Sequence, residues 1–318
     1  MAEQLTPVRR EVEAPPVGAS TGLGAPRASL PTALLRSARP RQWAKNVLVV
    51  AAPGAAGVLT QPPALVTVLL AFGAFCLFSS GTYFLNDARD VEADRRHPAK
   101  RKRPVAAGIV LVGVAVTAGI ALLVADLAVA IAVGPAFLAV VAGYVALTTS
   151  YTLWLKHVEV VDIVAIASGF IMRAVAGGAA VDVPLSRWFI IVASFGSLFI
   201  VAGKRHGEHI DLDESRGEIR ATLSAYSRDY LKYVWTMASG VTIAAYCLWA
   251  FEMAPRDSDV PLYELSIVPF VTFILRYALL LEEGHGGAPE DIVLSDRVLV
   301  VLAGAWVVVF GASVYFLR

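Results

Sequence analysis

The chain has 318 residues, of which 57% are hydrophobic and 17% are charged, and its formal net charge is +1. Since soluble proteins carry about 25% charged residues, this composition excludes an ordinary soluble enzyme and predicts an all-α polytopic membrane protein. A net charge this close to zero gives no reason to expect a nucleic-acid partner.

The first 32 residues are rich in Pro, Gly, Ala and charge without an apolar period, which predicts a disordered cytoplasmic tail. Residues 33–318 are predicted to form one transmembrane domain with nine helices, each near the length of about 20 residues that spans a bilayer. The expected spans are 46–61, 64–86, 105–125, 127–149, 160–181, 187–203, 233–253, 262–281 and 298–317. The first is short and contains Pro53, and a tight turn is expected around Asp126.

Lys and Arg residues predict the orientation of the helices, because cytoplasmic loops are enriched in them. Most of the 27 lie in the N-terminal segment or in alternate connections, whereas the remaining connections and the C-terminus hold only Arg187, Arg256 and Arg318. This asymmetry predicts a cytoplasmic N-terminus and an external C-terminus. Arg173 and Arg276 fall within predicted spans.

The second predicted helix runs into the segment "FLNDARDVEADRRHPAKRKRP", residues 84–104. If the helix continues to residue 94 at about 100° per residue, then Asn86, Asp87, Asp90 and Asp94 share one arc of about 100°. Carboxylates on one arc repel each other unless a cation joins them, and oxygen ligands completed by substrate phosphates suit Mg²⁺. The arc predicts a Mg²⁺–diphosphate site with Asp90 and Asp94 as catalytic residues. The basic run beyond it alternatively reflects only the charge bias of cytoplasmic loops.

The stretch "NDARDVEAD", residues 86–94, matches the N-D-x-x-D-x-x-x-D motif of the UbiA superfamily of intramembrane prenyltransferases, and the chain resembles that superfamily over residues 36–318. This resemblance implies a nine-helix fold. More narrowly, the chain resembles the branch that moves 5-phosphoribosyl from phosphoribosyl diphosphate (PRPP) to decaprenyl phosphate in mycolic-acid-producing actinobacteria, for cell-wall arabinan synthesis. The stretches that carry this narrower resemblance include "RPRQWAKN" at 39–46, "LKHVEVVDI" at 155–163, "FIMRAVAGG" at 170–178 and "GSLFIVAGKRHGEH" at 196–209.

The chain departs from the superfamily pattern after the sixth predicted helix. Classical members carry a second motif there, D-x-x-x-D, where this chain reads "GKRHGEHIDLDES" with Lys204, Arg205 and Glu208. Asp211 and Asp213 follow, but their spacing places them on different helix faces. A basic pair suits a more anionic pair of substrates, because PRPP carries a 5-phosphate besides its diphosphate and the acceptor is itself a phosphate.

Other polar residues near the predicted cytoplasmic face complete a candidate substrate-binding set. Arg173 lies deep in its predicted span, where a charge is costly, and either holds an acceptor or bridges helices. Lys45 either contacts phosphate or extends its amine to the membrane surface. The full candidate set is Lys45, Asn46, Tyr83, Lys100, Arg103, Tyr151, Lys156, Arg173, Lys204, Arg205 and Glu208.

The expected function is therefore Mg²⁺-dependent phosphoribosyl transfer from PRPP to a polyprenyl phosphate, in the plasma membrane and at its cytoplasmic face. One alternative is a classical enzyme that joins a prenyl diphosphate to an aromatic or porphyrin acceptor. A transporter is a further alternative, but it would place ionisable groups near the midplane and show internal repeats. The small-residue patches "AFGAF" at 71–75 and "AVAGGAA" at 174–180 permit close helix packing, either within the chain or in a homo-oligomer.

Overall fold

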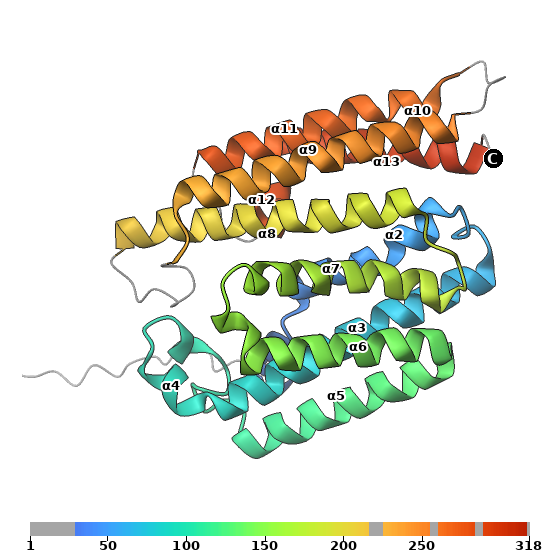
Figure 1. Ribbon diagram of the computed structural model, residues 1–318. Helices are drawn as coiled ribbons and strands as arrows, with labels where there is room; N and C mark the ends of the chain where they lie inside the picture. The colour runs from blue at the N-terminus through green and yellow to red at the C-terminus, as the bar shows by residue number, and fades with distance from the viewer. Residues whose placement is uncertain (1–28, 216–224, 255–259, 284–288, 317–318) are drawn as a thin grey trace, which may run out of the picture.

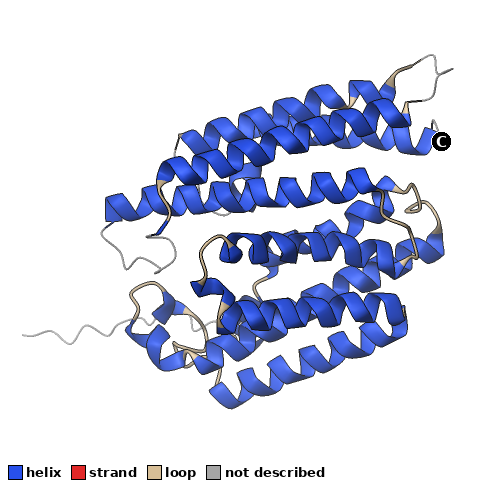
Figure 2. Cartoon of the chain, viewed as in Figure 1, coloured by secondary structure: helices blue, strands red, loops and turns tan. Residues whose placement is uncertain are grey.

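The computed structural model describes residues 29–215, 225–254, 260–283 and 289–316, and Figure 2 shows these residues as helices and loops without a strand. Within these described ranges, eight helical segments are long and apolar enough to cross a membrane. They are α3 (Pro62–Arg89), α5 (Val112–Val133), α6 (Pro135–Leu153), α7 (Val161–Ala180), α8 (Arg187–Ser215), α9 (Arg228–Met253), α10 with α11 (Leu262–Leu265 and Ile267–Glu282) and α13 (Arg297–Phe316). The predicted all-α membrane fold is confirmed.

The predicted first span, 46–61, is not one long helix. It begins in the last residues of a 3₁₀ helix, η1 (Pro40–Val47), continues as a short α-helix, α2 (Leu48–Ala55), and ends in turns at residues 56–61. Arg39 precedes η1 with a left-handed backbone (φ 54°) and Pro53 lies inside α2, so a single regular helix does not form here. The count of nine spanning helices is therefore not confirmed. Residues 1–28 of the predicted tail lie outside the described residues, while residues 30–32 already belong to α1 (Leu30–Ala38).

The turn predicted around Asp126 is wrong, because Asp126 is buried inside α5. The chain turns instead at Gly134, whose φ is 140°, followed by Pro135 at the start of α6. Pro is favoured in the first turn of a helix, and Gly tolerates this backbone conformation, so the dipeptide determines the turn more strongly than an isolated charge. The predicted span 105–125 is correspondingly too early, since residues 104–111 form turns before α5.

The two largest hydrophobic clusters of the described residues organise the bundle. One joins α2, α3, α5, α6 and α7 around Phe75 and Phe137, and the other joins α8, α9, α11 and α13 around Phe199 and Tyr277. Figure 1 shows the C-terminal ends of α3, α6 and α8 at one end of the bundle, together with the short helix α4 (Val91–Arg96), whereas α13 ends at the opposite end. The predicted polar residues therefore gather at one end. The remaining short helices are η2 (Lys100–Lys102), η3 (Leu155–His157) and α12 (Pro289–Ser295).

The small-residue patch at 174–180 packs within the chain. A Cβ atom added to Gly177 of α7 would lie 1.8 Å from the backbone oxygen of Val49 in α2, so the two helices touch through their backbones. In the other patch, a Cβ atom added to Gly73 would meet nothing within 4 Å. Gly177 thus fixes the position of α2, and through α2 the position of η1.

We expect Gly177→Ala to destabilise the protein by about 3 kcal/mol, at the upper end of overpacking effects, because a backbone atom has no rotamer with which to move aside. Thermal unfolding in detergent measures the change, and Gly73→Ala is the matched control with an unchanged or slightly higher Tm. Equal melting temperatures for Gly177→Ala and the wild type would contradict the close approach of α2 and α7.

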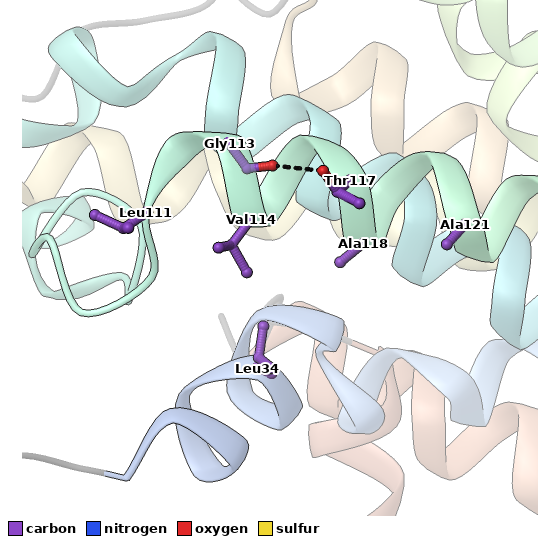
Figure 3. A pocket seen from close by; sticks show the side chains of 7 residues that line it. All are labelled: Leu34, Leu111, Gly113, Val114, Thr117, Ala118 and Ala121. Atoms are coloured by element: carbon purple, nitrogen blue, oxygen red, sulfur yellow. Dashed lines mark hydrogen bonds between the residues drawn. The ribbon is translucent and has the colours of Figure 1, made fainter.

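An apolar groove of about 620 Å³ lies between α1 and the beginning of α5. Figure 3 shows Leu34 facing Val114 and Ala118 across it, and the hydroxyl of Thr117 donates to the backbone oxygen of Gly113. The lining contains no charged side chain. This groove therefore lacks the groups that bind phosphate and is separate from the candidate site.

Candidate active site

The predicted acidic arc lies where α3 gives way to α4. α3 ends at Arg89, and Asp90 interrupts the helix with φ −92° and ψ 11°. The backbone N–H of Asp90 still bonds to Asn86 and that of Asp94 to Asp90, both at 2.9 Å. The helical phase thus continues across the interruption, and the predicted helix to residue 94 is correct except for this break.

Two of the four predicted metal ligands converge in the structure. Arg103 donates to Asp94 at 2.7 Å and to Asp87 at 3.3 Å, and Arg39 donates to Asp87 at 2.5 Å. Both carboxylates are almost fully buried, with 2% and 3% of the surface of Asp87 and Asp94 exposed. Arg39 also stacks over Tyr83, 4.5 Å from the ring centre. We name Asp87, Asp94, Arg39 and Arg103 the acidic cluster.

The other two predicted ligands stand apart from this cluster. Asp90 is half-exposed and pairs with Arg89 at 2.9 Å, while Asn86 is half-buried one turn earlier. The hydrogen bond from Arg89 holds the pKa of Asp90 below its ordinary value, with further help from the charges of Lys100 and Arg103, so Asp90 is ionised at neutral pH. Asp90 therefore retains its negative charge for a cation.

The oxygen ligands in this region suit Mg²⁺ in kind, but they do not form a complete metal site. Among the described residues, no three His, Cys, Asp or Glu side chains are arranged to hold a metal ion. The available ligands are nevertheless all oxygens, and Mg²⁺ is typically held by one or two carboxylates together with substrate phosphates. Asp87 and Asp94 supply such oxygens, but in the structure both already pair with arginines. The four-ligand arrangement that the sequence predicts is not assembled by the protein alone.

A second group of predicted residues lines a pocket of about 110 Å³. Its polar wall consists of Lys45, Lys204, Arg205 and Glu208, and its apolar wall is formed by α7 and α8, at Ile166, Phe170, Ile200 and Val201. We name it the basic pocket. Residues separated by more than 150 positions in the sequence therefore meet here.

Arg205 is the most firmly held residue of the basic pocket. It donates to Glu208 at 2.9 Å, to Asp162 at 3.2 Å and to Tyr151 at 3.4 Å. Only 4% of its surface is exposed, whereas the side chain of Lys204 is 43% exposed and lies 3.7 Å from Glu208. Arg205 is thus fixed in one position, and Lys204 is accessible to a ligand.

Helix η1 links the basic pocket to the acidic cluster. Arg39, just before η1, contacts Asp87, while Lys45 near its end lines the basic pocket and donates to Gln42 at 2.6 Å. Trp43 anchors η1 by donating to the hydroxyl of Ser80 in α3. The two sites are therefore joined by one short, anchored element.

Arg173 bridges helices, which is one of the two roles that the sequence left open. It donates to Asn46 at 2.9 Å, to Tyr144 at 2.7 Å and to the backbone oxygen of Gly169 at 2.8 Å. Its guanidinium also lies against the rings of Phe75, Tyr144 and Phe170. Because Asn46 is 1% exposed and bound to Arg173, the structure places it as a partner of Arg173.

Lys100 and Lys156 are exposed, in η2 and η3 respectively. The side chains of Asp211 and Asp213 lie outside the described residues.

The sequence did not identify Arg39, Asp162 or Tyr226 as site residues. Of these three, Asp162 could most readily have been identified from the sequence. It is an acid that follows two valines at the start of a membrane helix, where an ionised group needs a partner.

Comparisons with known proteins identify relatives of this chain. A profile of the UbiA prenyltransferase family matches residues 47–293. The chain is 44% identical over 303 residues to a decaprenyl-phosphate phosphoribosyltransferase of Corynebacterium glutamicum, covering 92% of this chain and 90% of that protein. It is 45% identical over 296 residues to a protein of the same name from Mycobacterium tuberculosis, covering 92% and 97%.

A solved structure shares the fold. A UbiA homologue from Archaeoglobus fulgidus, bound to GPP and Mg²⁺, superposes with a TM-score of 0.66 at 18% identity, covering 89% of this chain and 99% of that one. The helical bundle and the family match over more than two thirds of the sequence agree with one another. The chain belongs to the UbiA prenyltransferase family.

Proposed function

We propose that this protein transfers the 5-phosphoribosyl group of PRPP to decaprenyl phosphate and releases pyrophosphate. The observation that carries the proposal is the basic pocket, where Lys204 and Arg205 occupy the place of a second acidic motif. A prenyl diphosphate enzyme uses acidic residues there, whereas phosphate groups bind directly to cationic side chains. The names of relatives that are 44% and 45% identical over nearly their whole length support the same reaction.

The acidic cluster suits the diphosphate of PRPP. Asn86, Asp87, Asp90 and Asp94 are the residues that would hold Mg²⁺, which supplies positive charge to the departing pyrophosphate. Arg39 and Arg103 already lie against these carboxylates, so they are placed to donate to phosphate oxygens beside them. These residues bind the donor and orient its anomeric carbon toward the acceptor.

The reaction requires no general base from the protein. The bond between ribose C1 and pyrophosphate breaks through an oxocarbenium-like state, and an oxygen of the acceptor phosphate attacks C1 from the opposite face, with inversion. A phosphate monoester is largely ionised at pH 7, because its second pKa is about 6. The cationic groups of the basic pocket offset the repulsion between the acceptor phosphate and the anionic donor.

We further propose that the site faces the cytoplasm from the plasma membrane, where soluble PRPP reaches it. Helix α4 and the C-terminal ends of α3 and α8, which carry residues of the two site clusters, lie at one end of the bundle (Figure 1). Arg96 in α4 is exposed, as are Lys100 and Lys102 in the following helix η2. Loops enriched in Lys and Arg remain on the cytoplasmic side. The long tail of the acceptor keeps its phosphate in the bilayer near this end, so the two substrates meet at the membrane surface.

The proposal is tested with purified protein, radiolabelled PRPP and decaprenyl phosphate in detergent. We expect label to enter the lipid fraction with Mg²⁺ present and transfer to stop when EDTA removes the metal. Geranyl diphosphate with 4-hydroxybenzoate is the control pair of substrates and is expected to give no product. A prenylated aromatic product without any use of PRPP would replace this proposal with classical prenyl transfer, and a complete lack of covalent product would favour a transporter.

A further inference from the structure

A buried ion pair holds the basic pocket in shape. Asp162 of α7, with 1% of its surface exposed, accepts a hydrogen bond from Arg205 of α8 at 3.2 Å through Oδ2. Its second oxygen, Oδ1, accepts from the hydroxyl of Tyr226 at 2.5 Å. Since each carboxylate oxygen has a different partner, Tyr226 determines which way the carboxylate of Asp162 turns. The orientation of Asp162 in turn fixes the guanidinium of Arg205.

Tyr226 is itself rigidly placed at the connection that leads into α9. Its backbone oxygen contacts the ring of His209 at 3.0 Å, and its ring stacks on Tyr230 with centroids 5.7 Å apart and planes 4° apart. It packs in the cluster of Ile163, Val201 and Leu231, beside the apolar wall of the basic pocket. Burial, together with donation to Asp162, raises the pKa of Tyr226 well above its ordinary value, so the phenol keeps the proton that it donates.

The same hydroxyl holds a second segment of the site. It accepts a hydrogen bond from the backbone N–H of Val160, at the end of the loop that carries Lys156. Val160 has φ 65° and ψ −45°, a conformation that a β-branched residue rarely adopts. Such a backbone persists only where surrounding contacts impose it. Tyr226 supplies one of these contacts.

We propose that Tyr226 is a positioning residue that fixes Arg205, through Asp162, and the Lys156 loop, through Val160, for binding of the phosphate-bearing donor. This inference rests on the proposed phosphoribosyl transfer for its substrate, but not for its geometry. One hydroxyl joins the connection before α9, the start of α7 and the C-terminal part of α8. The hydroxyl fixes Arg205 and the Lys156 loop without touching a substrate.

The test compares Tyr226→Phe, which removes only the hydroxyl, with Tyr230→Phe, which removes the hydroxyl of the stacked partner. For Tyr226→Phe we expect KM for PRPP to rise about tenfold while kcat changes by less than about threefold, in line with loss of one hydrogen bond to a charged group. Amide exchange of residues 158–164, followed by mass spectrometry in detergent, is expected to accelerate about tenfold. Tyr230→Phe is expected to match the wild type in both measurements.

Unchanged exchange in Tyr226→Phe, or equal acceleration in Tyr230→Phe, would overturn the inference. So would a fall in kcat with an unaltered KM, because it would place the hydroxyl in the chemical step. If the wild-type protein transfers no phosphoribosyl group, the proposed function fails, while the exchange measurement still decides whether Tyr226 holds this segment.

Discussion

Replacing Asp94 with Asn is expected to lower the rate of phosphoribosyl transfer about a thousandfold while leaving the protein folded. The substitution keeps the size of the side chain but removes the charge that a cation needs, and loss of one electrostatic contact in a transition state costs about a hundred- to a thousandfold. Asp94 is buried against Arg103 at 2.7 Å. Asp87 lies 3.3 Å from the same guanidinium, so Arg103 retains a carboxylate partner in the variant.

Asp90→Asn is expected to cause a similar loss of rate with even less effect on folding, because the side chain of Asp90 is half-exposed and pairs with its neighbour Arg89. Glu92→Gln is the matched control, since Glu92 is exposed and pairs with Arg95 on the other side of α4. Initial rates at saturating PRPP across a Mg²⁺ series, with Tm measured in parallel, check all three variants. Near-normal rates of both aspartate variants at saturating Mg²⁺ would defeat the proposed metal site.

Arg205→Ala is expected to produce the second large effect, weakening the binding of PRPP and lowering the stability of the protein. Its removal leaves Asp162 as a buried carboxylate with Tyr226 as its remaining side-chain partner, and breaking a buried pair in this way costs about 3–5 kcal/mol. KM for PRPP is expected to rise by at least about tenfold, because a charged hydrogen bond to phosphate contributes about 1.5–3 kcal/mol. Both KM and Tm should therefore change.

Lys204→Ala separates the two effects. The side chain of Lys204 is largely accessible and its nearest carboxylate, on Glu208, is 3.7 Å away, so its loss should leave Tm within about 1 °C of the wild type. KM for PRPP should still rise about tenfold. If Lys204→Ala leaves KM unaltered while Arg205→Ala only lowers Tm, the basic pocket is structural and does not bind the donor.

From helical periodicity alone, the sequence predicted one arc of Asn86, Asp87, Asp90 and Asp94, of which the structure brings only Asp87 and Asp94 together. It did not predict that Asp87 and Asp94 would meet Arg39 and Arg103, since both arginines lie in irregular segments whose course has no period. The arginines reach the carboxylates from different directions. Local patterns carry no information about that approach.

The basic pocket was also predicted only in part from the sequence. The sequence alone indicated that basic residues gather at one membrane face. It did not indicate that Lys45 and Lys204 line the same pocket, because this depends on how η1 lies relative to α8. That position depends in turn on the contact between Gly177 and Val49. Arg173 is a further example, because its aromatic neighbours Phe75 and Tyr144 come from helices whose packing the sequence does not reveal.

The most direct test of the proposed phosphoribosyl transfer is the balance of products formed by the purified wild-type protein with Mg²⁺, labelled PRPP and decaprenyl phosphate. Pyrophosphate released into solution and ribose 5-phosphate bound to lipid are counted in the same reaction. We expect one pyrophosphate for each lipid-linked ribose 5-phosphate and no release when the acceptor is omitted. Release of pyrophosphate without lipid-linked ribose, or lipid labelling that is independent of Mg²⁺, would contradict it.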